Sequence, residues 1–214
     1  IPKKRLAVVT GGSAGIGLET AGLLKREGAR VAICGRTEER VQRAARQIHA
    51  LPLVGDVGRE EDAARMVDAV VREFGDYNTL VNNAGWGRFS PLKDLTVAEF
   101  RAILDTNVLG AMLMARESAR HFVKRSRGNI VNVSSTAGSR GFAGGTAYVA
   151  SKFALGGMTE CWRAELRKRA YSASLRPISS NRSSSPRLSN SPTTWIPLVD
   201  LIDELHTTTL RMQL

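Results

Sequence analysis

A glycine-rich turn near the start of the chain constrains its fold more than any other feature. Residues 6–10 are apolar and typical of a buried strand, and three spaced glycines, Gly11, Gly15 and Gly17, follow before a helical pattern begins. A turn without side chains lets backbone N–H groups approach a pyrophosphate, and the helix behind it turns the positive end of its dipole towards that charge. The order of strand, turn and helix therefore predicts dinucleotide binding by Gly11, Ser13, Gly15, Ile16 and Gly17.

Strand and helix patterns alternate through the first 170 residues. The segments that predict strands are 6–10, 30–34, 51–54, 79–82 and 129–133. The helical patterns cover 16–26, 38–49, 60–74, 97–124 and 148–169, with a capping-box pattern of Thr96 and Glu99 before the fourth. Such alternation argues for an α/β fold with a Rossmann-type, doubly wound parallel sheet covered on both faces. Ligands of such sheets bind at the carboxyl ends of the strands.

The composition changes after residue 169. Nine of the 23 residues from Ser172 to Thr194 are serine, and Pro177, Pro186 and Pro192 interrupt any periodic pattern. We therefore divide the chain into a dinucleotide-binding catalytic domain, residues 1–170, and a Ser/Pro/Arg-rich tail, residues 171–214. Within the tail, apolar residues on one helical face predict a short helix over residues 197–206.

Two polar segments follow the second and third strands, where a dinucleotide site meets the adenosine. Arg36 and Thr37 occupy a point where an acid would bind the ribose 2′-hydroxyl and a cation accommodates a 2′-phosphate, so they favour NADP over NAD. The alternative for Arg36 is a solvated side chain at a helix start. Asp56, with Val57 beside it, can accept a hydrogen bond from the adenine amino group, or it can cap the helix that begins near Glu60.

The segment after the fourth strand carries small residues and then aromatic ones. Small residues let a cofactor pass close to the backbone, although an ordinary strand-ending turn is the alternative. The residues concerned are Asn83, Ala84 and Gly85. Trp86 and Phe89, with Phe142 further along the chain, either line an apolar substrate pocket or serve only as packing residues.

A tyrosine and a lysine four residues apart suggest acid–base chemistry. Tyr148 and Lys152 lie on one face of the predicted helix. An isolated phenol titrates at about pH 10, which is poorly matched to proton transfer near neutrality, and an adjacent ammonium favours the phenolate. Lysine can also hydrogen-bond the cofactor ribose.

Three further polar residues are candidates for the same site. A hydroxyl at the end of the fifth strand could bind a substrate carbonyl, and Ser134 and Ser135 are rivals because strand side chains alternate in direction. Asn107 lies inside a helical pattern, where asparagine is a poor helix former. It either meets a buried partner or water, or lies on the surface without a role.

The net charge of +11 raises the question of a nucleic-acid partner. The basic residues are scattered along amphipathic helices and are not interleaved with aromatic residues, so we expect no nucleic-acid partner. No run is long and apolar enough to span a membrane, and no signal peptide is visible, which favours a cytoplasmic protein without a membrane partner. Cys34 and Cys161 form no pattern of disulfides or metal ligands, and we expect Cys34 to be a buried thiol.

Taken in order, these motifs closely resemble the classical short-chain dehydrogenase/reductase family, including members of the 3-oxoacyl-[acyl-carrier-protein] reductase type. The matching elements are Thr10-Gly11-x-x-x-Gly15-x-Gly17, Asp56, Asn82-Asn83-Ala84-Gly85, Asn107, Ser135 and Tyr148-x-x-x-Lys152. The resemblance covers about the first 170 residues. The spacing from Ser135 to Tyr148 is the family's usual one, which selects Ser135 over Ser134.

The resemblance implies an enzyme that transfers a hydride between a nicotinamide and a ketone, a 3-oxoacyl group or the corresponding alcohol. It implies that Tyr148 is the general acid and base, that Lys152 binds the ribose and supports the phenolate, and that Ser135 polarises the substrate oxygen. Asn107 would hold a water that connects Lys152 to solvent, and Arg36 resembles the basic residue of NADP-preferring members. Because the family often tetramerises through the two long helices, we expect a homo-oligomer, either a dimer or a tetramer.

The tail departs from the family. After the lysine helix, members have a sixth strand, a Pro-Gly pair, a threonine that holds the nicotinamide carboxamide, a substrate lid and a seventh strand. Here Ile178 follows Pro177, and neither a lid nor a normal seventh strand is recognisable, which suggests an altered reading frame near residues 169–172. Resequencing the gene tests that hypothesis. The tail also supports an alternative function, a catalytically impaired protein that binds dinucleotide only.

Overall fold

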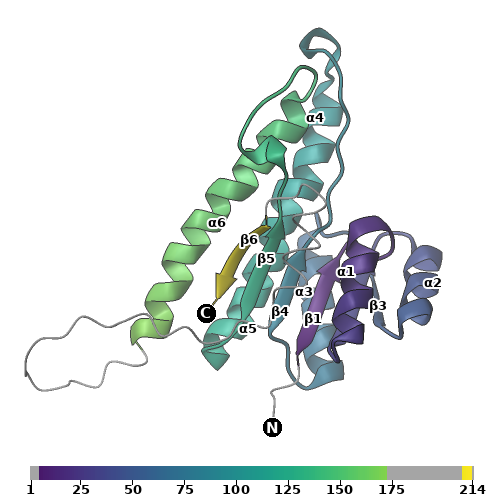
Figure 1. Ribbon diagram of the computed structural model, residues 1–214, viewed down its shortest axis with the longest axis vertical. Coiled ribbons are helices and arrows are strands. Elements are labelled where there is room, and N and C mark those ends of the chain that lie inside the picture. The colour runs from purple at the N-terminus through teal and green to yellow at the C-terminus, as the bar shows by residue number, and fades with distance from the viewer. Residues whose placement is uncertain (1–4, 173–208, 214) are drawn as a thin grey trace, which may run out of the picture.

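The structure, a computed structural model, describes residues 5–172 and 209–213 (Figure 1). The strands in this part of the chain are β1 (Leu6–Thr10), β2 (Arg30–Gly35), β3 (Leu51–Val54), β4 (Thr79–Asn82), β5 (Asn129–Val133) and β6 (Thr209–Gln213). The α-helices are α1 (Gly15–Arg26), α2 (Glu38–Ile48), α3 (Glu60–Phe74), α4 (Val97–Leu104), α5 (Ala111–Arg125) and α6 (Thr146–Ser172). Shorter segments are the 3-10 helices η1 (Leu92–Asp94) and η3 (Thr136–Gly138) and the π-helix η2 (Asp105–Gly110).

One six-stranded sheet, ordered β3-β2-β1-β4-β5-β6, forms the centre of the described fold. β1 to β5 pair in parallel, and Val8 lies opposite Ala32 on one side and Leu80 on the other. This arrangement confirms the Rossmann-type, doubly wound α/β fold expected from the sequence. The strand order reverses between β1 and β4, so the glycine turn after β1 lies at the point where such folds bind ligands.

The edge strand β6 is a feature that sequence analysis did not assign. It pairs antiparallel with β5, which places Thr209 opposite Val133 and Gln213 opposite Asn129. An antiparallel edge on an otherwise parallel sheet is common in folds of this class. The sequence signal is weak, because a short alternation of apolar and polar residues is too brief for a periodic argument. The helix predicted over residues 197–206 lies outside the described residues.

Alternating strand residues form two hydrophobic cores, one on each face of the sheet. On one face, α1 and α2 pack over a core that includes Ala7 and Val9. On the other face, α3 and α5 pack over Val8 and Leu80, and Trp162 of α6 joins this core at its margin. The long helix α6 runs beside β5 and β6 (Figure 1). The sheet therefore has helices on both faces, and α6 lies next to the last parallel strand.

The single helix predicted over residues 97–124 is interrupted in the structure. α4 begins behind the predicted capping box, in which the Glu99 N–H donates to Thr96 Oγ1 and the Glu99 carboxylate accepts from the Thr96 N–H. It ends at Leu104, and the wider turns of η2 separate it from α5. π-helical turns are rare and concentrate at functional positions. Asn107, one of the predicted site residues, lies in this segment.

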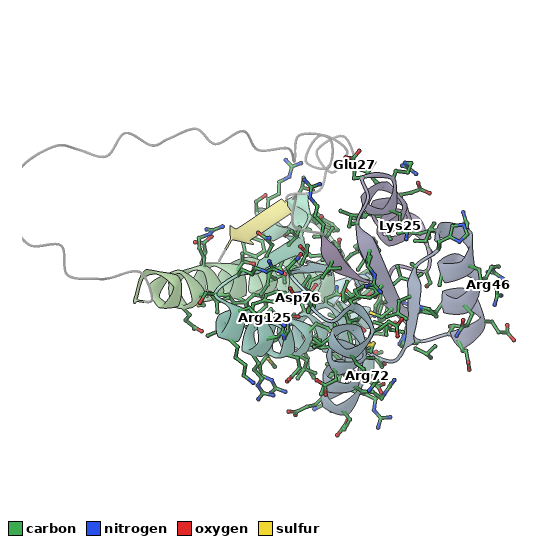
Figure 2. The ribbon with its side chains drawn as sticks, turned by 90° about the horizontal axis from the view of Figure 1, so that it is seen from below. Lys25, Glu27, Arg46, Arg72, Asp76 and Arg125 are labelled. Carbon is green, nitrogen blue, oxygen red and sulfur yellow. The ribbon has the colours of Figure 1, made fainter. Side chains whose placement is uncertain are left out.

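Basic residues lie in the last turns of several helices, at the end of the sheet opposite the glycine turn. The last turns of α1, α2, α3 and α5 contain Lys25, Arg46, Arg72 and Arg125, and Figure 2 looks onto this end of the molecule. Cations at helix C-termini offset the negative end of the helix dipole. Asp76 lies at the same end and forms an ion pair with Arg125 at 3.9 Å. Part of the net positive charge therefore has a structural explanation.

Other expectations concern membranes, metals and thiols. Within the residues that the structure describes, no helix is long and apolar enough to cross a membrane, and no group of three metal-ligating side chains comes together. Cys34 is buried as expected, and its burial raises the pKa of the thiol to about 12. Cys34 is therefore an inert core residue.

Candidate active site

The carboxyl ends of β1, β4 and β5 meet the beginning of α6 around one open cavity of about 600 Å³. The glycine turn with the start of α1 forms one wall, the segment after β4 forms a second, and β5 with α6 forms a third. The lining residues are Gly11, Ala14, Gly15, Ile16, Gly17, Asn83, Ala84, Gly85, Trp86, Gly87, Phe89, Val133, Ser134, Tyr148 and Lys152. The fold thus brings together the glycine turn, residues 83–85 and the Tyr148–Lys152 pair.

The glycine turn depends on the absence of side chains. Gly11 and Gly15 have positive φ angles of 63° and 53°, a region that other residues rarely adopt. A Cβ on Gly17 would overlap the carbonyl oxygen of Gly11, so the start of α1 packs directly against the turn. α1 begins without a side-chain cap at Ala14 and without an acidic residue in its first turn. Its first N–H groups therefore keep their capacity to bind an anion.

Thr10 and Asn83 join the glycine turn to the segment after β4. The Thr10 hydroxyl accepts hydrogen bonds from the backbone N–H groups of Asn83 and Ala84, both at 2.9 Å. The Asn83 side chain donates to the Thr10 carbonyl oxygen, also at 2.9 Å. These reciprocal bonds fix two walls of the cavity relative to each other. Thr10 belongs to the family motif drawn from the sequence, but sequence analysis gave it no role of its own.

The residues predicted for the adenosine half lie beyond the lining of this cavity. Arg36 has a side chain that is 67% exposed, and its Nη1 lies 3.9 Å from Asp56 Oδ2. Ser13 lies beside Gly35, because a Cβ on Gly35 would come within 3.2 Å of Ser13 Oγ. Thr37 is the N-cap residue of α2. Ser13, Arg36 and Asp56 therefore form a second group, on the side of the glycine turn that faces β2 and β3.

Asp56 does not cap α3, so one alternative left open by the sequence is excluded. Its Oδ1 accepts a hydrogen bond from the Gly58 N–H at 2.9 Å, whereas the N-cap residue of α3 is Arg59. Val57 is buried in the core, where a Cβ on Gly110 would overlap its side chain. Any contact of Val57 with a cofactor therefore falls to its backbone.

Tyr148 and Lys152 reach the cavity from the first turns of α6. Lys152 is only 6% exposed, and its Nζ donates a hydrogen bond to the Val133 carbonyl oxygen at 2.9 Å. The same Nζ lies 5.6 Å from the centre of the Tyr148 ring. Desolvation lowers the pKa of Lys152 from 10.5 to about 8. An ammonium with this pKa can release and regain a proton not far from neutral pH, beside the tyrosine.

Asn107 ties the segment after β4 to α6. Its Oδ1 accepts from the Trp86 N–H at 3.0 Å, and its Nδ2 donates to the Trp86 carbonyl at 2.8 Å and to Ser151 Oγ at 3.0 Å. A Cβ on Gly85 would come within 3.2 Å of Asn107 Oδ1 and 3.7 Å of Lys152 Nζ, so these three residues meet at one point. Asn107 is buried and hydrogen-bonded, and the surface alternative is excluded.

The two serines at the end of β5 are placed differently. Ser134 is buried and lines the cavity, whereas Ser135 is not among the lining residues. Ser135 is the N-cap residue of η3, and its Oγ accepts a hydrogen bond from the Ala137 N–H at 3.2 Å. That bond leaves the Ser135 hydroxyl proton to be donated elsewhere. The geometry therefore keeps both serines as candidates, and family spacing remains the argument for Ser135.

A buried polar chain anchors α6 to the sheet. Asn82 Nδ2 donates to Asn132 Oδ1 at 2.9 Å, and Asn132 Nδ2 donates to Thr159 Oγ1 at 2.8 Å. All three residues are buried, and buried hydrogen bonds are costly to leave unmade. The chain therefore holds α6 in one position over β4 and β5. Asn132 directly precedes Val133, whose carbonyl oxygen accepts the hydrogen bond from Lys152.

The sheet order and the glycine turn are those of Rossmann-type dinucleotide-binding folds, and the Tyr148–Lys152 pair lies in the same cavity. Comparison with known proteins names the family. The family model for the short chain dehydrogenases matches residues 5–174, and the chain belongs to this family. The resemblance drawn from the sequence is thereby confirmed.

Individual proteins support the same assignment. An uncharacterized oxidoreductase of Bacillus subtilis is 35% identical over 190 residues, which make up 86% of this chain and 53% of that protein. The crystal structure of NAD+-bound xylitol dehydrogenase is 34% identical, with a TM-score of 0.75 over 77% of this chain and 66% of that one. A metagenomic short-chain oxidoreductase in complex with NADP is 36% identical, with a TM-score of 0.73 over 77% of each chain. The chain thus spans little more than half the length of a curated relative such as the first.

Members of this family bind a nicotinamide dinucleotide, and the two solved structures contain different forms of it. The residues present here fit such a group. The turn at Gly11 and Gly15 presents backbone without side chains, and the N–H groups at the start of α1 suit a pyrophosphate. Lys152 adds a buried cation at the other end of the same cavity.

Burial of Lys152 predicts a specific dependence of stability on pH. Below about pH 8 both folded and unfolded chains keep the ammonium, so the folded state bears the full desolvation cost. Between pH 8 and 10.5 the folded chain loses the proton first, so the unfolded chain binds more protons and stability rises with pH. We expect Lys152→Met to stabilise the protein at pH 7, and its advantage over wild type to shrink by about 3 kcal/mol as pH rises to 10.5.

Urea unfolding of both proteins at several pH values from 7 to 10.5 measures this difference. Lys93→Met removes an exposed lysine and serves as the matched control, whose difference from wild type should stay flat. If the difference in unfolding free energy between Lys152→Met and wild type also stays constant with pH, the lowered pKa of Lys152 is contradicted.

Proposed function

We propose that this chain transfers a hydride between NADP and a ketone, a 3-oxoacyl group or the corresponding alcohol. The observation that carries the proposal is the burial of Lys152 beside the Tyr148 ring, in the cavity that the glycine turn opens onto. A buried cation next to a phenol is costly for stability and useful for proton transfer. The substrate and the direction of the reaction belong to this proposal and not to the family assignment.

Each residue has one role in the proposal. When bound, the nicotinamide supplies or accepts the hydride. In reduction, the Tyr148 hydroxyl donates its proton to the substrate oxygen, and in oxidation its phenolate takes that proton back. The Lys152 ammonium supports the phenolate, and the Ser135 hydroxyl donates a hydrogen bond to the substrate oxygen. Asn107 positions Trp86 and α6, and it would hold a water between Lys152 and solvent.

The remaining roles concern cofactor binding. Backbone at Gly11, Gly15, Ile16 and Gly17 would hold the pyrophosphate, and residues 83–85 would border the nicotinamide half. Asp56 would accept from the adenine amino group, with the Val57 backbone beside it. Arg36, with Ser13 and Thr37 near it, would hold the 2′-phosphate of NADP, because β2 ends without an acid that would repel it.

We extend the proposal to the organisation of the protein. Residues 1–170 would form the catalytic domain, and the protein would be a dimer or a tetramer assembled through α5 and α6. A groove of about 840 Å³ between these two helices supports the second point, because its lining is largely apolar and includes Trp162 and Leu166. Sedimentation of the full chain measures the oligomeric state.

Tyr148→Phe tests the central role. The variant keeps the ring but loses the transferable proton, so turnover of NADPH with a carbonyl substrate should fall at least about a hundredfold. NADPH binding, measured by titration, should stay within about threefold of wild type, since the glycine turn is untouched. Turnover that survives the substitution would refute the role of Tyr148. Wild-type protein that binds NADPH without any turnover would favour the catalytically impaired alternative.

The serine pair gives a separate prediction. Loss of a hydrogen bond to the reacting oxygen should lower kcat about ten- to a hundredfold in Ser135→Ala. Ser134→Ala removes a buried hydroxyl from the same strand end and should leave kcat within about threefold of wild type. Steady-state kinetics of the two variants at saturating NADPH provide the measurement. The reverse ranking would transfer the role to Ser134.

Cofactor preference is tested at Arg36. A hydrogen bond between charged groups contributes about 1.5–3 kcal/mol, so Arg36→Ala should raise the KM for NADPH about ten- to a hundredfold and leave that for NADH unchanged. Arg46→Ala is the matched control, because Arg46 lies in the last turn of α2, the helix that follows Arg36, at the end shown in Figure 2. Equal effects of Arg36→Ala on both cofactors would remove the argument for NADP.

A further inference from the structure

Two exposed aromatic rings stand beside the proposed acid–base group. Phe89 is 60% exposed and lines the active-site cavity, and Phe142 is 49% exposed. The centre of the Phe89 ring lies 5.7 Å from that of Tyr148 and 5.5 Å from that of Phe142, and the ring meets both edge to face. Exposed rings that gather at a cavity mark a binding surface. The sequence left open whether these rings line a substrate pocket or serve only in packing, and the contact of Phe89 with Tyr148 favours the pocket.

The loops that carry these rings are tied to each other. The Ser90 N–H donates to the Gly144 carbonyl oxygen at 3.0 Å, and the Gly145 N–H donates to the Phe142 carbonyl oxygen at 3.1 Å. Gly144 has a φ angle of 78°, which favours glycine, and a Cβ on Gly145 would come within 2.7 Å of the Phe142 ring. The backbone segments that carry the two rings are therefore joined to each other.

The segment that carries Phe89 also passes close to the Tyr148 ring. A Cβ on Gly87 would come within 2.7 Å of the Tyr148 ring, so only glycine allows this approach. Trp86 is fixed on the other side of Gly87, because Asn107 holds its backbone and the Thr106 hydroxyl accepts from its indole Nε1–H at 3.3 Å. The wall beside the Tyr148 ring, formed by Trp86, Gly87 and Phe89, is thus largely aromatic.

Apart from the Tyr148 and Ser134 hydroxyls, the polar side chains that line this cavity already have hydrogen-bond partners within the protein. Among the lining residues that the structure describes, Lys152 is the only charged one, and its Nζ donates to Val133. The Asn83 amide donates to the glycine turn. A substrate with several hydroxyl groups would exchange its hydrogen bonds to water for bonds at the reacting oxygen only. An apolar ring would instead cover the exposed face of Phe89.

We propose that Phe89, with Phe142 behind it, selects substrates whose reacting carbon belongs to an apolar ring or is attached directly to one. The inference rests on the proposed function, because it names the substrate class of the same site. It assigns Phe89 as the residue that contacts the ring and Phe142 as the residue that positions Phe89. The ring contributes through burial of apolar surface, for which a single pocket contact discriminates by about tenfold or more.

Kinetics with two ketones test the assignment. With NADPH, wild-type kcat/KM should be at least about tenfold higher for cyclohexanone than for butan-2-one. Phe89→Ala should lower kcat/KM at least about tenfold for cyclohexanone and less than about twofold for butan-2-one. Phe89→Leu keeps apolar bulk, so its kcat/KM for cyclohexanone should lie between the values of wild type and of Phe89→Ala. Leu92→Ala removes a 75% exposed leucine from the same loop and should change neither value. Equal loss for both ketones in Phe89→Ala, or no preference in wild type, would overturn the proposal.

A binding measurement separates this proposal from the proposed function. Equilibrium binding of 1-tetralone in the presence of NADP+ requires no turnover. Phe89→Ala should weaken it at least about tenfold, whereas Leu92→Ala should not. If Phe89→Ala loses tetralone binding but wild-type protein turns over no ketone, the role of Phe89 is supported and the proposed function is refuted. If wild-type protein turns over butan-2-one and Phe89→Ala binds tetralone as wild type does, the role of Phe89 is refuted and the proposed function is not.

Discussion

The buried ammonium of Lys152 is the interaction on which the rest of the site depends. Its Nζ has the Val133 carbonyl oxygen as a hydrogen-bond acceptor and lies near the Tyr148 ring, in surroundings that disfavour its charge. Burying a cation in this way costs stability, so the fold must hold α6 firmly against β5. The Asn82–Asn132–Thr159 chain of hydrogen bonds attaches α6 to β4 and β5. The hydrogen bond from Asn107 to Ser151 attaches the same helix to η2.

The cofactor end of the cavity is organised by a different device. Thr10 and Asn83 exchange hydrogen bonds across the point where the strand order reverses, so the glycine turn and the segment after β4 form one unit. Asn107 then holds the next residue of that segment, Trp86, by both its N–H and its carbonyl oxygen. The two ends of the cavity are therefore connected through hydrogen bonds between side chains and backbone. A change at Asn107 would disturb both the aromatic wall and the helix that bears Lys152.

Much of this arrangement could be predicted from the sequence because it depends on local patterns. β1, β3, β4 and β5 have the predicted bounds, and the capping box of Thr96 and Glu99 forms as expected. The glycine turn and the four-residue spacing from Tyr148 to Lys152 could likewise be recognised in the sequence. Each of these features is decided within one or two turns of chain, where spacing and side-chain type suffice.

The rest depends on contacts between segments distant in the sequence. The π-helix η2 interrupts a pattern that looks continuous, and Asn107 within it bonds to Trp86 and Ser151, which are distant in the sequence. The role of Thr10 depends on its partners Asn83 and Ala84 in the segment after β4, which are distant in the sequence. The choice between Ser134 and Ser135 came from family spacing, and the structure leaves it to experiment. The assignment of these groups to catalysis likewise stays a prediction.

Isotope transfer tests the central claim most directly, namely that this cavity carries out hydride transfer with Tyr148 moving the proton. The protein would be incubated with NADPH carrying deuterium at C4 of the nicotinamide and with a ketone, and the alcohol product would be analysed by mass spectrometry and NMR. The account predicts deuterium on the carbinol carbon with wild-type protein and almost none with Tyr148→Phe. Wild-type protein that binds the labelled NADPH but yields no deuterated alcohol with any ketone, or an equal yield from the Tyr148→Phe variant, would contradict it.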